Sequence, residues 1–294
     1  MSFQDDSPPA LENPMKIIPS IPTMQRLSRK WKSAGKKIGF VPTMGALHQG
    51  HLELVKTSRR ENDVTVVSIF VNPTQFGPQE DFKKYPRTLD QDCSLLRREK
   101  VQAVFSPSDH EMYAADPNIK IHITGSLVSG LCAPFRPGHF DGVALVVVKL
   151  LNIVMPTHLY LGQKDAQQVA VLKRTISELN LEVVPVVCPI VRERDGLAMS
   201  SRNKLLSMEG RRTAPALFKA LMEGKRVART GEKNPGNVLA EAKKVLSKEK
   251  KIKLQYLEAV DPSTLTPVSK IKKGTMLALA AYLDNVRLID NIVI

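Results

Sequence analysis

Blocks of apolar and polar positions alternate along the first two thirds of the chain and predict strands and helices in turn. Residues 64–71 form a continuous β-branched run, as expected of a parallel strand that is buried on both faces. Further strands are predicted at 37–41, 103–105, 158–161 and 181–187. Helical spacing is found at 51–61, 89–100, 143–154 and 166–179. This order predicts an α/β fold, a Rossmann-like doubly wound parallel sheet with helices on both faces.

The pattern changes beyond residue 203. A long helical pattern at 208–229 is followed by a Gly/Pro/Asn breaker cluster. Asp284-Asn285 between two apolar runs predicts a hairpin turn. A helix at 238–247 and strands at 253–260, 275–282 and 286–293 complete this part. We expect a disordered lead-in at 1–14, a Rossmann-like nucleotide-binding domain at 15–203 and a small α+β lid domain at 204–294.

Composition describes a globular protein with a sizeable core, since 43% of its 294 residues are hydrophobic and 24% are charged. No apolar stretch approaches the roughly 20 residues of a membrane span. The acidic first 14 residues lack the basic start and apolar centre of a secretory signal. The three cysteines, Cys93, Cys132 and Cys188, form no C-x-x-C pair, which fits a reducing compartment. We expect a cytoplasmic protein without a membrane partner.

The formal net charge of +14 raises the alternative of an RNA-binding protein. The lysines that cluster between Lys243 and Lys253 surround a short helical pattern without interleaved aromatic residues. Such a distribution favours a solvated helix face or a basic surface near an anionic substrate over a nucleic-acid site. We therefore expect no nucleic-acid partner.

The segment 42–51, Pro-Thr-Met-Gly-Ala-Leu-His-Gln-Gly-His, lies where a predicted strand changes into a helix. Free backbone N–H groups and the helix dipole favour phosphate at such a turn. Gly45 and Gly50 allow a ligand to approach closely because neither has a Cβ. His48 and His51 can donate to phosphoryl oxygens. A metal pair or two packed structural histidines are the alternatives, and the segment favours a nucleotide site.

Other polar clusters follow predicted strands or precede predicted helices. The amides of Asn72 and Gln75 suit recognition of a hydroxyl or a carboxylate. Arg136 and His139 lie in a Gly/Pro-rich turn before a helix. The acidic helix start at Asp90 and Asp92, after Tyr85, offers outer partners for a divalent cation, although a capped helix explains it equally well.

Two further segments suit phosphate oxygens. Lys164 follows the strand at 158–161 and can hold a phosphate as a point charge, although an exposed lysine at a helix start is the simpler alternative. Ser200, Ser201 and Arg202 place two hydroxyls and a guanidinium in a row, on a loop that could close over a triphosphate.

Together these segments resemble one family. The pairing of His48-x-Gly50-His51 with Met199-Ser200-Ser201-Arg202 is similar to the nucleotidyltransferase superfamily, which handles ATP as class I aminoacyl-tRNA synthetases do. Within it, the chain resembles the pantothenate synthetase (pantoate–β-alanine ligase) family at 42–51, 70–78, 85–87, 136–142, 162–168 and 195–203. The resemblance implies that ATP adenylates D-pantoate with release of pyrophosphate, and that β-alanine converts the adenylate to pantothenate and AMP. It also implies Mg²⁺ and a homodimer.

The resemblance implies roles for individual residues as well. The catalytic group comprises His51 as proton donor together with His48, Lys164, Ser200, Ser201 and Arg202. ATP-binding residues would be Met44, Gly45, Ala46, Leu47, His48, Gln49, Gly50, His51, Gly162, Gln163, Lys164, Asp165, Val191, Met199, Ser200, Ser201 and Arg202. Substrate-binding residues would be Gln75, Gln168, Asn72, Tyr85, Arg136 and His139, and Asp92 would contact the metal.

The sequence departs from the family pattern at Ala144, Leu161 and Ala166, where the family usually has Thr, Phe and an aromatic residue, and at Gln91, where an acid is common. The departures at Ala144 and Ala166 affect the packing expected on the pantoate side but not the class of reaction. The enzyme alternative is a nucleotidyltransferase that stops at an adenylylated or nucleotide product. A requirement for an amine-bearing second substrate separates the two.

Overall fold

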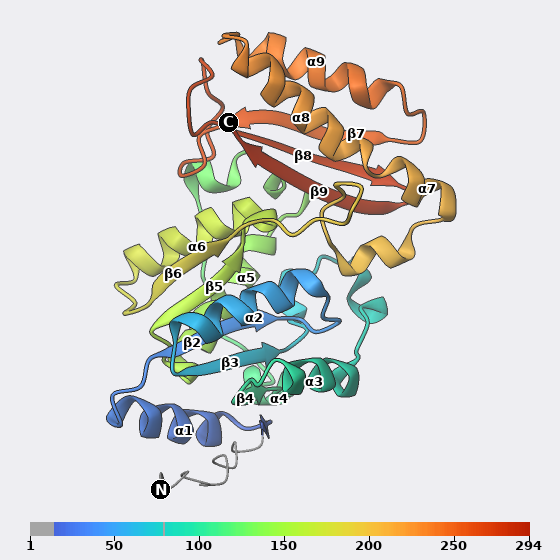
Figure 1. The fold of residues 1–294 in the computed structure, drawn as a ribbon. Coiled ribbons are helices and arrows are strands. Elements are labelled where there is room, and N and C mark those ends of the chain that lie inside the picture. The colour runs from blue at the N-terminus through green and yellow to red at the C-terminus, as the bar shows by residue number, and fades with distance from the viewer. Residues whose placement is uncertain (1–14, 79) are drawn as a thin grey trace, which may run out of the picture.

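The larger sheet has six parallel strands in the order β1-β4-β3-β2-β5-β6 (Figure 1). The computed structural model describes residues 15–78 and 80–294, so the predicted lead-in at 1–14 lies outside the described residues. The prediction of a Rossmann-like doubly wound α/β sheet is confirmed. Its strands are β1 (Lys16–Ile18), β2 (Ile38–Thr43), β3 (Val64–Ile69), β4 (Ala103–Phe105), β5 (His158–Gly162) and β6 (Val184–Cys188).

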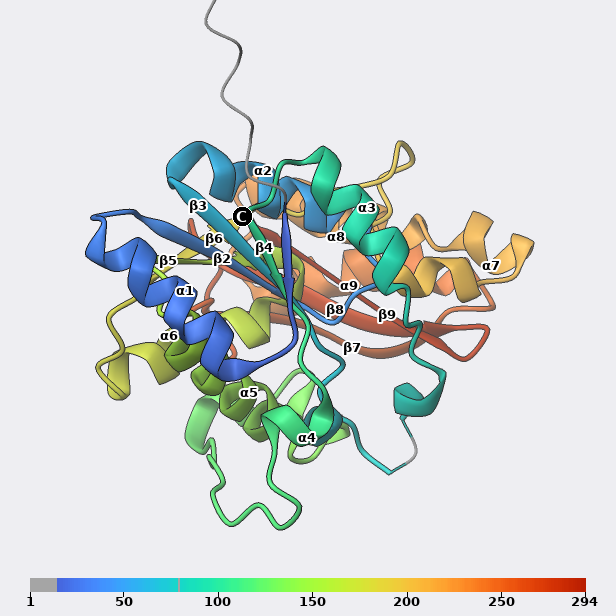
Figure 2. The same cartoon turned by 90° about the horizontal axis from the view of Figure 1, so that it is seen from below.

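Helices cover both faces of this sheet, as Figure 2 shows from below. Successive side chains of a strand point to opposite faces. Phe40 and Val66 therefore meet one helical layer, whereas Val41 and Val67 meet the other. The first layer contains α1 (Ile21–Ser33), α5 (His139–Val154) and α6 (Ala166–Glu178), and the second contains α2 (Gln49–Glu61) and α3 (Leu89–Arg98).

Short helical turns fill the connections between these elements. Most of them follow a strand or precede a long helix. They are α4 (Asp109–Met112), η1 (Pro73–Gln75), η2 (Asp81–Lys84), η3 (Gly125–Val128), η4 (Ala133–Phe135), η5 (Gln163–Asp165) and η6 (Ser201–Leu205).

The C-terminal part forms an antiparallel sheet in the order β7-β8-β9. Its apolar face packs against two helices around Leu217, Leu221 and Leu277. Asp284 and Asn285 both have positive φ, at 50° and 65°, and form the predicted two-residue hairpin turn. The elements are α7 (Met208–Thr213), α8 (Ala216–Arg229), α9 (Pro235–Ser247), β7 (Lys253–Val260), β8 (Met276–Leu283) and β9 (Val286–Val293).

The two sheets are joined by a shared apolar cluster. Phe140 and Val171 from the helices of the large sheet pack with Met276 and Ala278 from β8. The predicted boundary at residue 203 falls inside η6, in the segment that leads from one sheet to the other. The domain limits stay a prediction.

Three features differ from the predicted elements. The prediction contains neither β1 nor α1. The single helix expected at 208–229 is two helices, because Pro215 has no N–H for the helical ladder. The strand expected from 181 begins at Val184, since the Leu181 N–H still donates to the Ile176 carbonyl at the end of α6. Among the described residues, no helix is long and apolar enough to span a bilayer.

Candidate functional site

The turn between β2 and α2 (residues 44–48) lies at the carboxyl end of β2. Gly45 and Ala46 have φ of +79° and +50°, so the chain turns back sharply before α2 begins. A Cβ at Gly45 would lie 3.0 Å from Asp92 Oδ2. The Asp92 carboxylate accepts from the N–H groups of Ala46 (2.9 Å) and Leu47 (2.8 Å) and from the Thr88 hydroxyl (3.0 Å). This buried carboxylate from α3 therefore fixes the turn.

Both histidines of the turn accept a backbone N–H at Nδ1. The Gly50 N–H donates to His48 Nδ1 (3.1 Å), and the His48 N–H donates to His51 Nδ1 (3.3 Å). Each imidazole therefore carries its proton on Nε2 when it is neutral. A Cβ at Gly50 would lie 2.8 Å from the His48 ring, so this contact requires glycine. His48 and His51 together thus form the N-terminal cap of α2. Their Nδ1 atoms are used in this cap, and each ring keeps an Nε2–H donor.

The environment keeps these imidazoles neutral. Burial, followed by the influence of His48 and of the Lys164 charge, lowers the pKa of His51 to about 3. Burial, followed by the Lys164 charge, lowers the pKa of His48 to about 4. At neutral pH each ring is a hydrogen-bond donor without a positive charge, and the cations beside them come from other elements.

A cavity of about 220 Å³ opens at this turn and brings together most of the predicted site residues; we call it the nucleotide cavity. Its walls come from the carboxyl ends of β2 and β5, from η1 and from the loop at 191–203. This is where ligands bind in doubly wound sheets. The predicted residues that line it are Met44, His48, Gly50, His51, Asn72, Gln75, Tyr85, Gly162, Lys164, Asp165, Gln168, Val191, Met199, Ser200, Ser201 and Arg202.

The other predicted residues lie around this cavity. Gly45, Ala46 and Leu47 shape the turn behind it. Gln49 is partnered by Glu53 on the surface of α2, and Gln163 is partnered by Asn291. Arg136 and His139 lie behind Gln75. Of the departures, Leu161 lines the cavity, whereas Ala144 is fully buried in α5 and Ala166 packs between the two sheets.

The amides of η1 are held in a fixed orientation. Asn72 Nδ2 donates to Gln75 Oε1 and to the Gly142 carbonyl, both at 3.1 Å, and Asn72 Oδ1 accepts from the Tyr113 hydroxyl at 2.7 Å. A Cβ at Gly142 would lie 2.3 Å from the Thr74 carbonyl oxygen, so glycine is required for η1 to meet α5 this closely. These contacts present the Gln75 amide to the cavity. No pattern in the sequence pointed to Tyr113.

Arg136 joins this group through an ion pair that the sequence did not predict. Its Nε and Nη2 donate to the two carboxylate oxygens of Glu80 at 2.7 and 2.6 Å. Its Nη1 lies 2.9 Å from His139 Nε2, and His139 Nδ1 lies 2.8 Å from the Gln75 carbonyl oxygen. Burial and the Arg136 charge lower the pKa of His139 to about 4, so a neutral His139 donates from Nδ1 and accepts at Nε2.

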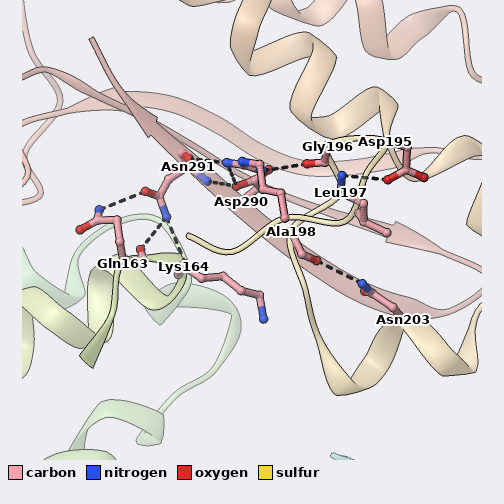
Figure 3. A network of polar contacts seen from close by, with 10 residues as sticks. Gln163, Lys164, Asp195, Gly196, Leu197, Ala198, Asn203, Asp290 and Asn291 are labelled. Carbon is pink, nitrogen blue, oxygen red and sulfur yellow. Dashed lines mark hydrogen bonds and ion pairs between the residues drawn. The ribbon is translucent and has the colours of Figure 1, made fainter. Parts of the chain in front are cut away.

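The C-terminal sheet holds the backbone at Gln163 and Lys164, as Figure 3 shows. Asn291 Nδ2 donates to the carbonyls of Gln163 (2.9 Å) and Lys164 (3.1 Å), and Asn291 Oδ1 accepts from Gln163 Nε2 (3.0 Å). Asn291 is only 2% exposed, although it lies on β9 in the other part of the chain. Its amide therefore fixes η5, which carries Lys164 into the nucleotide cavity.

The loop at 191–203 (the 191–203 loop) is held by the same sheet. Arg192 donates to both Asp290 carboxylate oxygens at 2.6 and 2.9 Å, and its guanidinium lies 3.8 Å from the centre of the Phe218 ring. Arg211 of α7 pairs with Glu193 and with Asp195. Within the loop, Asn203 Nδ2 donates to the Ala198 carbonyl at 3.1 Å (Figure 3). The position of Ser200, Ser201 and Arg202 (the hydroxyl–arginine run) thus depends on residues far along the chain.

Asp290 and Asn291 were missed by the sequence analysis, although the sequence contained a signal. Adjacent residues of a strand point to opposite faces, so two neighbouring polar residues in an apolar strand cannot both face solvent on one side. Both side chains are buried, at 4% and 2% exposed. A break in the alternation of β9 was therefore the signal for a polar contact.

The donor set fits a Mg²⁺ ion that arrives with a nucleotide better than a resident ion. Among residues 15–78 and 80–294, no group of three or more His, Cys, Asp or Glu could hold a metal. Asp165 is the only carboxylate among the described residues that line the nucleotide cavity. Mg²⁺ often binds through one or two carboxylates together with substrate phosphates. The role of Asp92 as a metal contact stays a prediction, whereas its contacts give it a positioning role.

Comparison with known sequences adds an independent line of argument. A family model described as pantoate-beta-alanine ligase matches residues 16–293. The chain is 51% identical to a pantothenate synthetase of Sulfurihydrogenibium sp. (strain YO3AOP1), over 95% of this chain and 99% of the relative. It is 50% identical to that of Thermotoga petrophila, over 95% of this chain and 100% of the relative.

Solved structures agree with the sequence comparison. The pantothenate synthetase of Thermus thermophilus superposes with a TM-score of 0.90 at 40% identity, over 95% of this chain and 99% of that chain. The pantoate-beta-alanine ligase of Francisella tularensis, complexed with beta-gamma ATP and beta-alanine, has a TM-score of 0.79 at 35% identity, over 95% and 97% of the two chains.

Proposed function

Because the chain belongs to the pantoate–β-alanine ligase family, and is therefore a ligase that forms pantothenate, we propose that it uses ATP through an acyl-adenylate intermediate. A carboxylate is a poor acyl donor, so transfer to an amine needs a better leaving group. Adenylation of D-pantoate provides AMP as that group. The Francisella relative is complexed with beta-gamma ATP and beta-alanine, which supports ATP and β-alanine as substrates here.

In the first step a pantoate carboxylate oxygen attacks the α-phosphorus of ATP. The new P–O bond forms as the bond to pyrophosphate breaks, and pyrophosphate leaves with that electron pair. Negative charge gathers on the phosphoryl oxygens, which calls for positioned donors. The neutral His48 and His51 offer Nε2–H groups, and Lys164 and Arg202 supply positive charge in the same cavity.

Other residues of the nucleotide cavity fit the remaining parts of this step. Ser200 and Ser201 add hydroxyl donors to the phosphate side. Met44, Gly162, Val191 and Met199 would surround the nucleotide. Mg²⁺ bound to the ATP phosphates would neutralise part of their charge, and Asp165, which lines the same cavity, would supply a carboxylate ligand.

In the second step the amine of β-alanine attacks the acyl carbon of the adenylate. The C–N bond forms, the bond to AMP breaks, and the amine proton is released. The Gln75 and Gln168 amides face the nucleotide cavity and suit the hydroxyl and carboxyl groups of pantoate, while Asn72 fixes Gln75. Tyr85 lines the same cavity.

One observation carries the proposal: two imidazoles held as Nε2–H donors face Lys164 and Arg202 across one cavity at the carboxyl ends of β2 and β5. The test is AMP formation from ATP and Mg²⁺ with D-pantoate and β-alanine omitted in turn. We expect sustained AMP and pantothenate formation only with both substrates, and pyrophosphate exchange into ATP with pantoate alone. Pyrophosphate release with a stable adenylylated product, and no AMP release even when β-alanine is present, would instead favour a nucleotidyltransferase.

We also propose a cytoplasmic homodimer, as the family resemblance implies. The three cysteines are buried and free, which suits a reducing compartment. Sedimentation equilibrium tests the dimer: a mass near twice 32.6 kDa is expected, and a single-chain mass across micromolar concentrations would contradict it.

A further inference from the structure

The Glu80–Arg136 ion pair occupies the position at which an arginine usually receives a carboxylate. Nε and Nη2 form the edge that binds both oxygens of one carboxylate, and Glu80 takes this edge at 2.7 and 2.6 Å. The guanidinium also lies 2.9 Å from His139 Nε2 and donates to the Gln75 carbonyl at 3.4 Å. A second carboxylate could therefore bind this edge only by replacing Glu80.

Arg136 borders the reaction space. It lines a small cavity of about 70 Å³ together with Lys164, Asp165, Ser200 and Arg202. The same four residues also line the nucleotide cavity. Arg136 further contacts the backbone carbonyl of Gln75, whose side chain faces the nucleotide cavity. The Arg136 guanidinium thus borders a cavity whose lining includes residues of the nucleotide cavity.

The positive charge of Arg136 explains why the protein supplies its own carboxylate, from Glu80, when no substrate is bound. An arginine side chain stays protonated in proteins, and Arg136 is only partly exposed, so it requires an anion nearby. Burial alone would raise the pKa of Glu80, but its hydrogen bonds to Arg136 and the Arg136 charge hold that pKa below the ordinary value. Glu80 is therefore an anion at neutral pH and neutralises Arg136.

Resting on the function proposed above, we propose that Glu80 holds the carboxylate position of the amine substrate on Arg136, and that the β-alanine carboxylate replaces it. The exchange leaves Arg136 with one carboxylate before and after binding. Glu80 then competes with β-alanine and sets its apparent affinity. If Glu80 only positioned Arg136, its removal would instead weaken β-alanine binding.

The test compares the wild-type chain with Glu80→Gln, which keeps the shape and removes the charge. The KM for β-alanine should fall about tenfold, since a charged bidentate competitor becomes a neutral one, while kcat changes by less than about twofold. Pantoate-dependent pyrophosphate exchange, which needs no β-alanine, should be unchanged. An unchanged or raised KM for β-alanine would overturn the proposal.

A substrate without the carboxylate provides the decisive control. β-Alaninamide carries the amine but no anion, so Glu80→Gln should leave its KM at the wild-type value. An equal fall in KM for β-alanine and for β-alaninamide would show that the variant changes something other than carboxylate exchange. This result would also overturn the proposal. Glu223→Gln removes a matched bidentate Glu–Arg pair on the exposed side of α8 and should affect neither amine.

Two further measurements separate this proposal from the proposed function. Glu80→Ala repeats the test if Glu80→Gln does not fold, with the melting temperature as the check. Calorimetric titration of β-alanine, in the presence of ATP and pantoate analogues that cannot react, measures the exchange without turnover. A wild-type chain that forms no pantothenate would defeat the proposed function alone, whereas equal β-alanine affinity in wild-type and variant chains would defeat the exchange.

Discussion

Two walls of the nucleotide cavity carry the residues proposed to bind phosphate, and the two walls are built in different ways. The turn at 44–48 and the first turn of α2 are held by their own backbone N–H groups and by Asp92, 46 residues from Ala46. The 191–203 loop is held by Asp290, 98 residues from Arg192, and by Arg211 of α7. Both walls present polar donors to the same space.

The difference lies in where each wall draws its stability. The first wall belongs wholly to the large sheet, so it stays formed if the C-terminal sheet moves. The second wall and η5 are tied to β9 through Asp290 and Asn291 (Figure 3). Any shift of the C-terminal sheet therefore carries Lys164 and the hydroxyl–arginine run with it. The C-terminal part thus holds half of the proposed phosphate site.

Loss of the His51 imidazole should have the largest effect. His51→Ala removes a donor aimed at the charge that develops on phosphate, so adenylation should fall about a thousandfold. The measurement is pantoate-dependent pyrophosphate exchange into ATP, with the melting temperature to show that the chain is folded. His110→Ala, at an exposed position, is the control. Exchange at the wild-type rate in folded His51→Ala would remove this residue from the chemistry.

Loss of the Asp290 carboxylate should separate the two walls. Asp290→Ala leaves the largely buried Arg192 without its partner and should lower the free energy of unfolding by about 3 kcal/mol. The KM for ATP should rise about tenfold because the 191–203 loop loses its anchor.

Two outcomes sharpen this comparison. The Nε2–H tautomers of His48 and His51, read from nitrogen chemical shifts, should be unchanged in Asp290→Ala, because the first wall does not depend on β9. Asp116→Ala, at an exposed position, should alter neither stability nor KM. An altered histidine tautomer in Asp290→Ala would show that the walls are not independent.

Replacement of Asp92 should affect the opposite wall. An asparagine presents only one acceptor oxygen to two buried backbone N–H groups, so Asp92→Asn should lower the free energy of unfolding by about 2 to 3 kcal/mol. The KM for ATP should rise with it. Asp90→Asn, on the exposed side of the same helix start, is the matched control. Equal stability of the two variants in urea denaturation would contradict the positioning role of Asp92.

The same contrast explains how much the sequence could predict. The order of strands and long helices between residues 37 and 188 followed from blocks of apolar residues, whereas β1 and α1 were not predicted. The histidines of the first wall followed from one segment in which His48, Gly50 and His51 are close in sequence, but the support from Asp92 did not. The residues that support the second wall could not be found in this way, because Asp290 and Asn291 reach their partners only when β9 packs against η5. The break at Pro215 was overlooked, although a proline inside a helical pattern is a local signal. Glu80 carried no local signal at all, since pairing with Arg136 needs the fold.

The histidines should also make stability depend on pH. The pKa values of His51, His48 and His139 lie at about 3, 4 and 4, below the ordinary value of 6.5. The unfolded chain therefore binds protons that the folded chain does not. The stability that the folded chain gains from these neutral histidines is fully present above pH 6.5. It is lost as the pH falls toward the pKa values of the histidines in the folded chain. For each histidine, the free energy of unfolding should be about 2 kcal/mol lower at pH 5 than at pH 7.

Denaturation of His51→Gln at both pH values measures this effect. The difference in unfolding free energy between pH 7 and 5 should be smaller in the variant than in the wild type by the contribution of one histidine, about 2 kcal/mol. His110→Gln, which alters an exposed ring, should leave the difference unchanged. The same pH dependence in all three chains would contradict neutral, buried imidazoles.

The central claim is that both walls act on the phosphates of ATP, and Asn291→Ala tests it most directly. Pyrophosphate takes part only in the first step, so one chain can be assayed for pantoate-dependent pyrophosphate exchange and for reaction of preformed pantoyl adenylate with β-alanine. We predict that exchange falls about tenfold, as expected for a phosphate contact displaced from its position, while use of the adenylate stays within about twofold of the wild type. Equal loss in both assays, in a chain that is folded, would contradict the claim.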